Sequence, residues 1–117
     1  MVDLDDVYCM ARQGDDFREE DTWAAARRAC GALAESFFAS GLDVVVVDGE
    51  FFNAEEWNEL QTCVQPQTDV RFFTLVVPFE ETFRRAQGDP NRQDTSEIWY
   101  KRMHEKFISS LGFLRDT

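Results

Sequence analysis

The sequence has few residues that bind metals through nitrogen or sulfur. It contains one histidine, His104, and three cysteines, and no two cysteines form a CxxC pair. Because a zinc site requires four nitrogen or sulfur ligands at close spacing, this scatter argues against zinc. We interpret Cys9, Cys30 and Cys63 as reduced thiols of a cytoplasmic protein, and we expect Cys30 to lie in the core.

Positive charge and long hydrophobic runs are also scarce. The 12 Lys and Arg residues face 23 Asp and Glu residues, and the net charge is -11. Nucleic acids and anionic membranes bind clustered cations, so we expect neither as a partner. The apolar runs are too short for a transmembrane helix or a signal peptide. The length of 117 residues predicts a single domain, residues 1–117.

One apolar stretch, Gly41–Gly49, contains four consecutive valines between two aspartates. Because these valines cannot alternate in and out, they predict a strand covered on both faces, as in parallel sheets between helices. Asp48 follows the valines and places a carboxylate at the carboxyl edge, where ligands bind in open α/β sheets. A plain Asp-Gly turn is the alternative interpretation.

Strands and helices are predicted to alternate along the chain. Strands are expected near Met1–Leu4, at the valines and over residues 70–77, and an acidic loop is expected over residues 11–22. Helices are expected from Asp21 or Thr22 to Gly41, from the cap Asn53 to about Val64, after Pro78 and from Ser96. The first helix is expected to bury a stripe made of Trp23, Ala26, Cys30, Leu33 and Phe37. This order predicts an α/β fold with a parallel sheet.

Three fragments carry a resemblance to a known family. They are Leu4-Asp5-Asp6-Val7-Tyr8, the stretch Leu42–Gly49, and Phe73–Pro78 with the following Glu80-Glu81. In order and spacing they resemble the small P-loop kinases of the zeta-toxin and chloramphenicol-phosphotransferase-like group. The resemblance covers most of the chain. It implies a three-layer α/β/α sandwich with a parallel sheet.

The phosphate-binding motif of that family, GxxxxGK[ST], occurs nowhere in this sequence. In P-loop proteins this motif points backbone N–H groups at the phosphates, its Lys neutralises their charge, and its Ser or Thr holds Mg²⁺. The resemblance therefore implies a sheet that is incomplete at the first strand, with a gap and two exposed edges.

By resemblance, the chain is an ATP- and Mg²⁺-dependent phosphotransferase that acts on a hydroxyl of a small molecule. As this isolated chain it is expected to have little or no activity. Asp6 would accept the hydroxyl proton, Asp5 would bind substrate, Asp48 would reach Mg²⁺, and Arg85 and Arg92 would close over the phosphates. Judged from the residues alone, the same aspartates also fit the start of a loop, and the arginines fit surface cations of an acidic chain.

Two other interpretations stay open at this point. One is a non-catalytic, degenerate kinase domain that dimerises or binds another chain through its open sheet edges. The other is a flavodoxin-like fold, which is disfavoured because Asp5 and Asp6 would repel a phosphate bound after the first strand.

Overall fold

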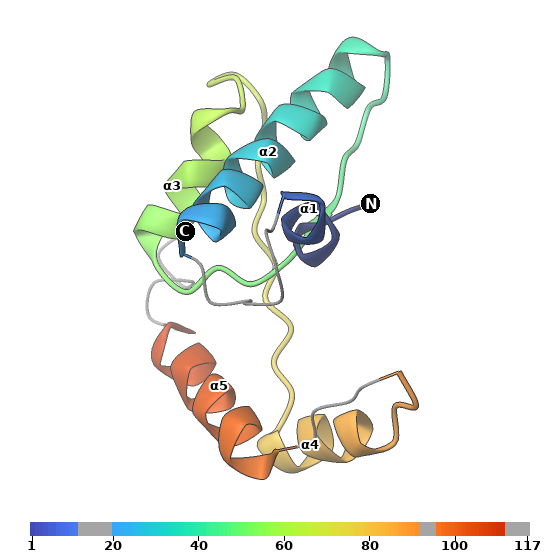
Figure 1. The fold of residues 1–117 in the computed structure, drawn as a ribbon. Coiled ribbons are helices and arrows are strands. Elements are labelled where there is room, and N and C mark those ends of the chain that lie inside the picture. Colours follow the sequence, from blue (N-terminus) through green and yellow to red (C-terminus); the bar gives the residue numbers. More distant parts are fainter. Residues whose placement is uncertain (12–19, 92–95, 112–117) are drawn as a thin grey trace. The chain divides into compact units, whose positions relative to one another are not determined.

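The structure is a computed structural model that describes residues 1–11, 20–91 and 96–111 (Figure 1). The described residues form five helices and two short strands. In chain order these are β1 (Val2–Asp3), α1 (Leu4–Ala11), α2 (Glu20–Ala39), β2 (Val47–Asp48), α3 (Ala54–Thr62), α4 (Phe79–Gln87) and α5 (Glu97–Ser109). The chain divides into two compact units, Met1–Val70 and Arg71–Thr117. None of the helices in the described ranges is long and apolar enough to cross a membrane.

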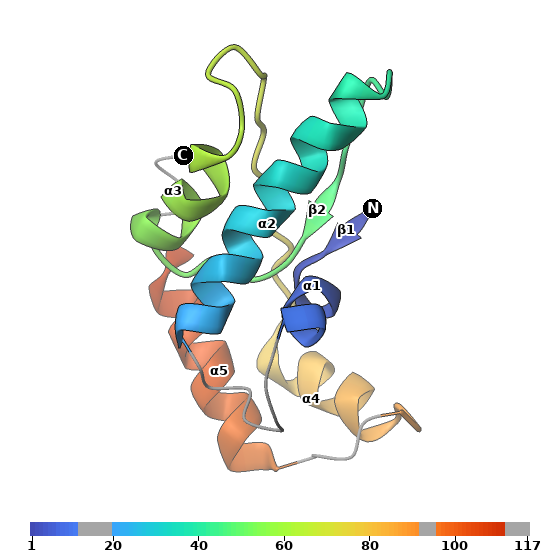
Figure 2. The same ribbon diagram turned by 45° about the horizontal axis from the view of Figure 1, so that its top comes forward.

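The long helix α2 is the centre of the first unit and packs against α1, α3 and β1 (Figure 2). Leu4, Tyr8 and Cys30 are the largest fully buried side chains, and the Tyr8 ring stacks on Trp23 with centroids 3.8 Å apart. A Cβ at Gly31 would lie 2.3 Å from the backbone oxygen of Leu60 in α3. The close packing of α2 on α3 therefore requires glycine at this position.

A buried cation joins the same two helices. The Arg27 residue in α2 is 4% exposed. Its Nε donates to Glu59 at 2.9 Å, its Nη2 donates to Glu20 at 2.6 Å, and its Nη1 lies 3.7 Å from Glu56. Burial alone would lower the pKa of Arg27, but the hydrogen bonds to Glu59 and Glu20 and the nearby charges outweigh it and raise the pKa. Arg27 is therefore a charged residue that holds α3 to α2.

Local sequence signals set the helix ends. The Leu42 N–H donates to the Phe37 carbonyl at 3.1 Å and the Gly41 N–H donates to the Phe38 carbonyl at 3.0 Å. With a φ of 98° at Gly41, these two bonds make the Schellman ending that the sequence predicts for α2. At the start of α3, the Asn53 side chain accepts from the Glu56 N–H at 2.8 Å, which confirms the predicted cap.

The second unit contains helices α4 and α5, which pack through aromatic rings. Phe83 lies 5.7 Å from Phe79 and 6.0 Å from Tyr100, measured between ring centroids. The ring of His104 is 5.8 Å from Phe79, so this histidine belongs to the aromatic cluster. The Ser96 side chain caps α5, as the sequence predicts.

The prediction of a three-layer α/β/α sandwich, P-loop kinase-like and incomplete at the first strand, is wrong for this structure. The sheet of the described residues has two strands, β1 and β2, and the remaining regular elements are helices. Residues 70–77 form no strand, and Phe73 and Leu75 in this segment are 83% and 87% exposed. The physical reason is that a buried parallel strand needs paired neighbours and two covered faces, whereas in the described residues this segment pairs with no strand and leaves Phe73 and Leu75 exposed.

Two local predictions also need correction. The valine run is not covered on both faces, because Val44 is 76% and Val46 is 56% exposed. The buried stripe of α2 is rotated from the predicted one. It consists of Ala26, Arg27, Cys30, Gly31 and Ala34, while Phe37 is exposed. Ala26 and Cys30 are buried as predicted. The rest of the prediction failed because apolar character alone identified the stripe, whereas packing on α3 buries a glycine and an ion-paired arginine.

Candidate functional site

The aspartates that were predicted to do chemistry lie around the carboxyl end of the two-stranded sheet. Strands β1 and β2 run parallel, with Val2 opposite Val47 and Asp3 opposite Asp48. Asp5 and Asp6 follow at once in the first turn of α1, and both residues are exposed. They lie in a helix, so the interpretation of Asp5-Asp6 as the start of a loop is wrong. The sheet thus places Asp3 and Asp48 side by side, with Asp5 and Asp6 in the next turn of chain.

The hydrogen bonds at this end are those of a helix start. The Asp3 carboxylate accepts from the Asp5 N–H at 2.9 Å, and the acidic side chains of the first turn suit the positive end of the α1 dipole. Asp3 was missed by sequence reasoning, although its position just before Leu4-Asp5-Asp6 is a capping signal. In the part of the chain that the structure describes, His, Cys, Asp and Glu side chains form no group of three that could hold a metal ion.

Arg85, which was predicted to bind phosphate, instead pairs with a carboxylate of its own helix. Arg85 lies in α4, in the second unit, and its Nε donates to Glu81 at 2.8 Å. The neighbouring Arg84 binds the same carboxylate, with its Nη2 2.5 Å from Glu81 Oε1. Both arginines are exposed, and their hydrogen bonds lower the pKa of Glu81 to about 2. Arg92 lies outside the described residues.

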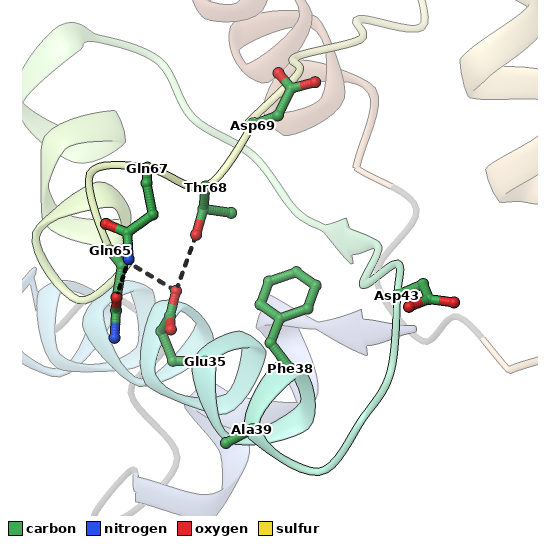
Figure 3. A pocket seen from close by; sticks show the side chains of 8 residues that line it. All are labelled: Glu35, Phe38, Ala39, Asp43, Gln65, Gln67, Thr68 and Asp69. Carbon is green, nitrogen blue, oxygen red and sulfur yellow. Dashed lines mark hydrogen bonds between the residues drawn. The ribbon is translucent and has the colours of Figure 1, made fainter.

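A surface depression lies elsewhere in the first unit, between the end of α2 and the segment after α3 (Figure 3). Its lining includes Glu35, Phe38, Asp43 and Asp69. Glu35 accepts hydrogen bonds from the Gln65 N–H at 3.0 Å and from the Thr68 hydroxyl at 3.4 Å. These bonds join the segment after α3 to α2. Of the predicted site residues that the structure describes (Asp5, Asp6, Asp48 and Arg85), none lines the depression.

The second edge of β2 is the most distinctive feature of the first unit. The Val2 N–H donates to the Val46 carbonyl at 2.8 Å, so the peptide groups of Val46 and Asp48 face β1. In a parallel ladder the peptide groups of alternate residues face opposite edges, so the N–H and C=O of Val47 face away from β1. An extension of the strand toward its start would add those of Val45, two residues earlier, to the same edge. Among the described residues no third strand pairs there.

Apolar side chains accompany this open edge. Leu42, Val44 and Val46 are 52%, 76% and 56% exposed, whereas Val45 and Val47 are half-buried. This alternation has the period of two that a strand requires. We call the peptide groups of Val45 and Val47, together with the exposed side chains of Leu42, Val44 and Val46, the β2 edge. The sequence shows the four valines but not which of their sides is left open.

Comparison of the chain with protein-family models, with curated proteins and with solved structures finds no match.

Proposed function

We propose that this chain is a non-catalytic binding module that accepts a β-strand of a partner at the β2 edge. The observation that carries the proposal is the outer edge of β2, where the N–H and C=O of Val47 face away from β1 and no third strand of the described residues pairs. An open edge is a template for pairing, because an added strand satisfies these groups in regular geometry.

The exposed side chains beside the edge support the same function. Leu42, Val44 and Val46 are spaced by two residues and are all more than half exposed. A strand that pairs at the edge brings its own side chains next to them, about 5 Å away across the ladder, and removes apolar surface from water. Specific recognition of a strand combines main-chain hydrogen bonds with alternate side-chain contacts, and both are offered here.

Peptides displayed on phage provide the test. A library of eight-residue peptides is selected on the full chain and then screened on two proline variants. Val45→Pro removes an N–H from the open edge, whereas the matched control Val44→Pro removes an N–H on the side of β1, outside the ladder.

We expect the selected peptides to alternate apolar residues, to keep binding the Val44→Pro variant and to lose binding to Val45→Pro. Circular dichroism checks that both variants remain helical. If proline unfolds either chain, protection of the Val45 and Val47 amides from hydrogen exchange on adding a selected peptide to the unaltered chain replaces the comparison. Peptides without alternation, or amides that stay unprotected, would overturn the proposal.

A phosphotransferase is the second candidate, and one observation favours it. The parallel pairing of β1 and β2 gathers Asp3, Asp48, Asp5 and Asp6 at one end of the sheet. In this proposal Asp6 accepts the proton of a small-molecule hydroxyl and Asp5 binds that molecule. In the described part of the chain no group of three His, Cys, Asp or Glu side chains could hold a metal ion, so Mg²⁺ at Asp48 would need the phosphates of a bound nucleotide as further ligands. No step is therefore assigned to ATP or to the metal.

The phosphotransferase proposal is tested by incubating the chain with Mg-ATP and a panel of small hydroxyl compounds. Little or no phosphate transfer is expected, because the sequence lacks GxxxxGK[ST]. Transfer at an ordinary kinase rate that Asp6→Asn abolishes would instead establish the enzyme.

A further inference from the structure

We propose that the strand bound at the β2 edge is cationic at both ends, with a Lys or Arg on each side of four apolar or β-branched residues. This inference rests on the proposed function and adds the chemistry of the partner. It follows from the charges that flank the exposed valines.

Carboxylates stand at both ends of the four valines of the β2 edge. Asp43 precedes the four valines and Asp48 follows them, and both residues are exposed. Asp3 lies opposite Asp48 on β1 and adds a further negative charge at that end. A strand that pairs along Val44–Val47 therefore meets an acidic group at each of its ends, whether it runs parallel or antiparallel. A partner with Lys or Arg at both ends places a cation next to each acidic group in either orientation.

The spacing of the two aspartates defines the partner more closely. Asp43 and Asp48 are five positions apart, which is about 17 Å when the segment between them is extended. Pairing along Val44–Val47 would extend this segment, which is a strand only at Val47–Asp48 in the structure, and in an extended strand an odd spacing places the two carboxylates on opposite faces. The partner should therefore carry its cations five positions apart, and their side chains should also point to opposite faces. The residues between them pair with the valines and need β propensity.

The net charge disfavours a second copy of this chain as the partner. Each copy carries a net charge of -11 and would bring another acidic edge to the contact. Like charges that face each other slow association and weaken it. A cationic strand is attracted to the aspartates of this edge, whereas a second copy of the chain is repelled by them.

The test uses three synthetic peptides that differ only at the two end positions. The first is Ser-Lys-Val-Thr-Val-Thr-Lys-Ser, and the others replace both lysines by serine or by glutamate. Fluorescence anisotropy measures the binding of each labelled peptide to the full chain at low and at high salt. Sedimentation of the chain alone measures its self-association.

We expect the lysine peptide to bind about tenfold more tightly than the serine peptide, since two exposed ion pairs each contribute a modest factor. High salt should remove most of this difference. The double substitution Asp43→Asn with Asp48→Asn should abolish the preference for lysine. Glu97→Gln with Glu105→Gln, two exposed residues of α5, changes the net charge equally and should preserve it.

Three outcomes overturn the inference. Equal binding of the lysine and glutamate peptides, lost in Val45→Pro, would keep the edge as the site but remove the charge requirement. A dimer of the chain that Val45→Pro dissociates would make a second copy the occupant, and the proposed function would stand. Failure of all three peptides, with no peptide recovered from the displayed library, would remove the proposed function as well.

Discussion

Replacing Arg27 by methionine should destabilise the first unit by about 3 kcal/mol, because it breaks a buried ion cluster from one side. The Arg27 side chain is 5% exposed, and it lies between Glu59 and Glu56, whose side chains are 21% and 13% exposed. Methionine keeps much of the apolar volume, so the expected loss comes from charge and hydrogen bonding more than from a cavity.

The magnitude follows from the three contacts of Arg27. The hydrogen bond to Glu59 at 2.9 Å joins two shielded charged groups, and such a bond contributes roughly 1.5–3 kcal/mol. The contact with Glu20 is short at 2.6 Å, but the Glu20 side chain is 71% exposed, so it contributes roughly 0.2–1 kcal/mol. Removing the cation also leaves Glu56 and Glu59 near each other without a compensating charge.

Urea unfolding followed by circular dichroism at the helix band measures the free energy of unfolding. The control is Arg28→Met, because Arg28 is the next residue of α2 and is exposed. It should change stability by no more than about 0.5 kcal/mol. A triple variant, Arg27→Met with Glu56→Gln and Glu59→Gln, should recover part of the loss, since it removes the unpaired carboxylates. If Arg27→Met and Arg28→Met unfold at the same urea concentration, the cluster does not hold α3 to α2.

Three further predictions concern single groups. Asn53→Ala should destabilise the chain by about 1 kcal/mol through loss of the α3 cap, as measured in the same urea assay. The Glu81 carboxyl should titrate with a pKa of about 2 by NMR, and Arg84→Ala should move this pKa toward the ordinary 4.5. Because the pKa is lower in the folded chain than in the unfolded chain, the stabilisation from Glu81 is complete above pH 4.5. It is lost as the pH falls to about 2. Burial and the charge of Asp3 raise the pKa of Cys30 to about 11. Iodoacetamide at about pH 8 should therefore alkylate the exposed Cys9 in the folded chain and leave the buried Cys30 unmodified. Mass spectrometry of the peptides measures the modification of each cysteine.

Local signals in the sequence predicted several helix ends, although α1 was missed and Asp21 and Thr22, the predicted caps of α2, lie inside that helix. Asn53, Pro78 and Ser96 each begin a helix in the structure, and Gly41 ends α2 with a positive φ. Each of these signals depends on a few neighbouring residues, because the Asn53 and Ser96 caps are hydrogen bonds within one turn and Pro78 acts through its fixed φ without a side-chain cap bond. Such bonds form in the same way whatever the rest of the chain does.

Sheet formation could not be predicted in the same way. The valine run and residues 70–77 have strand composition, yet in the described residues only Val47 and Asp48 of these stretches join a ladder. A strand is stabilised by its neighbours, and composition does not say which neighbours are present. The ion cluster of Arg27 escaped prediction for a related reason, since Glu56 and Glu59 lie on α3, about thirty residues along the chain.

The dependence of strands on their neighbours also explains why the best-supported site, the β2 edge, lies where the sequence predicted burial. Val44 and Val46 have the composition of residues inside a sheet, but they are 76% and 56% exposed. Exposed apolar side chains beside unpaired peptide groups are a hazard, which proteins commonly limit by placing charges at the edge. Here Asp43 and Asp48 supply those charges. They oppose pairing with another acidic copy of this chain, and they favour a strand with cations at both ends. The two aspartates thus connect the exposure of the valines with the choice of partner, which makes their substitution the most informative change at this site.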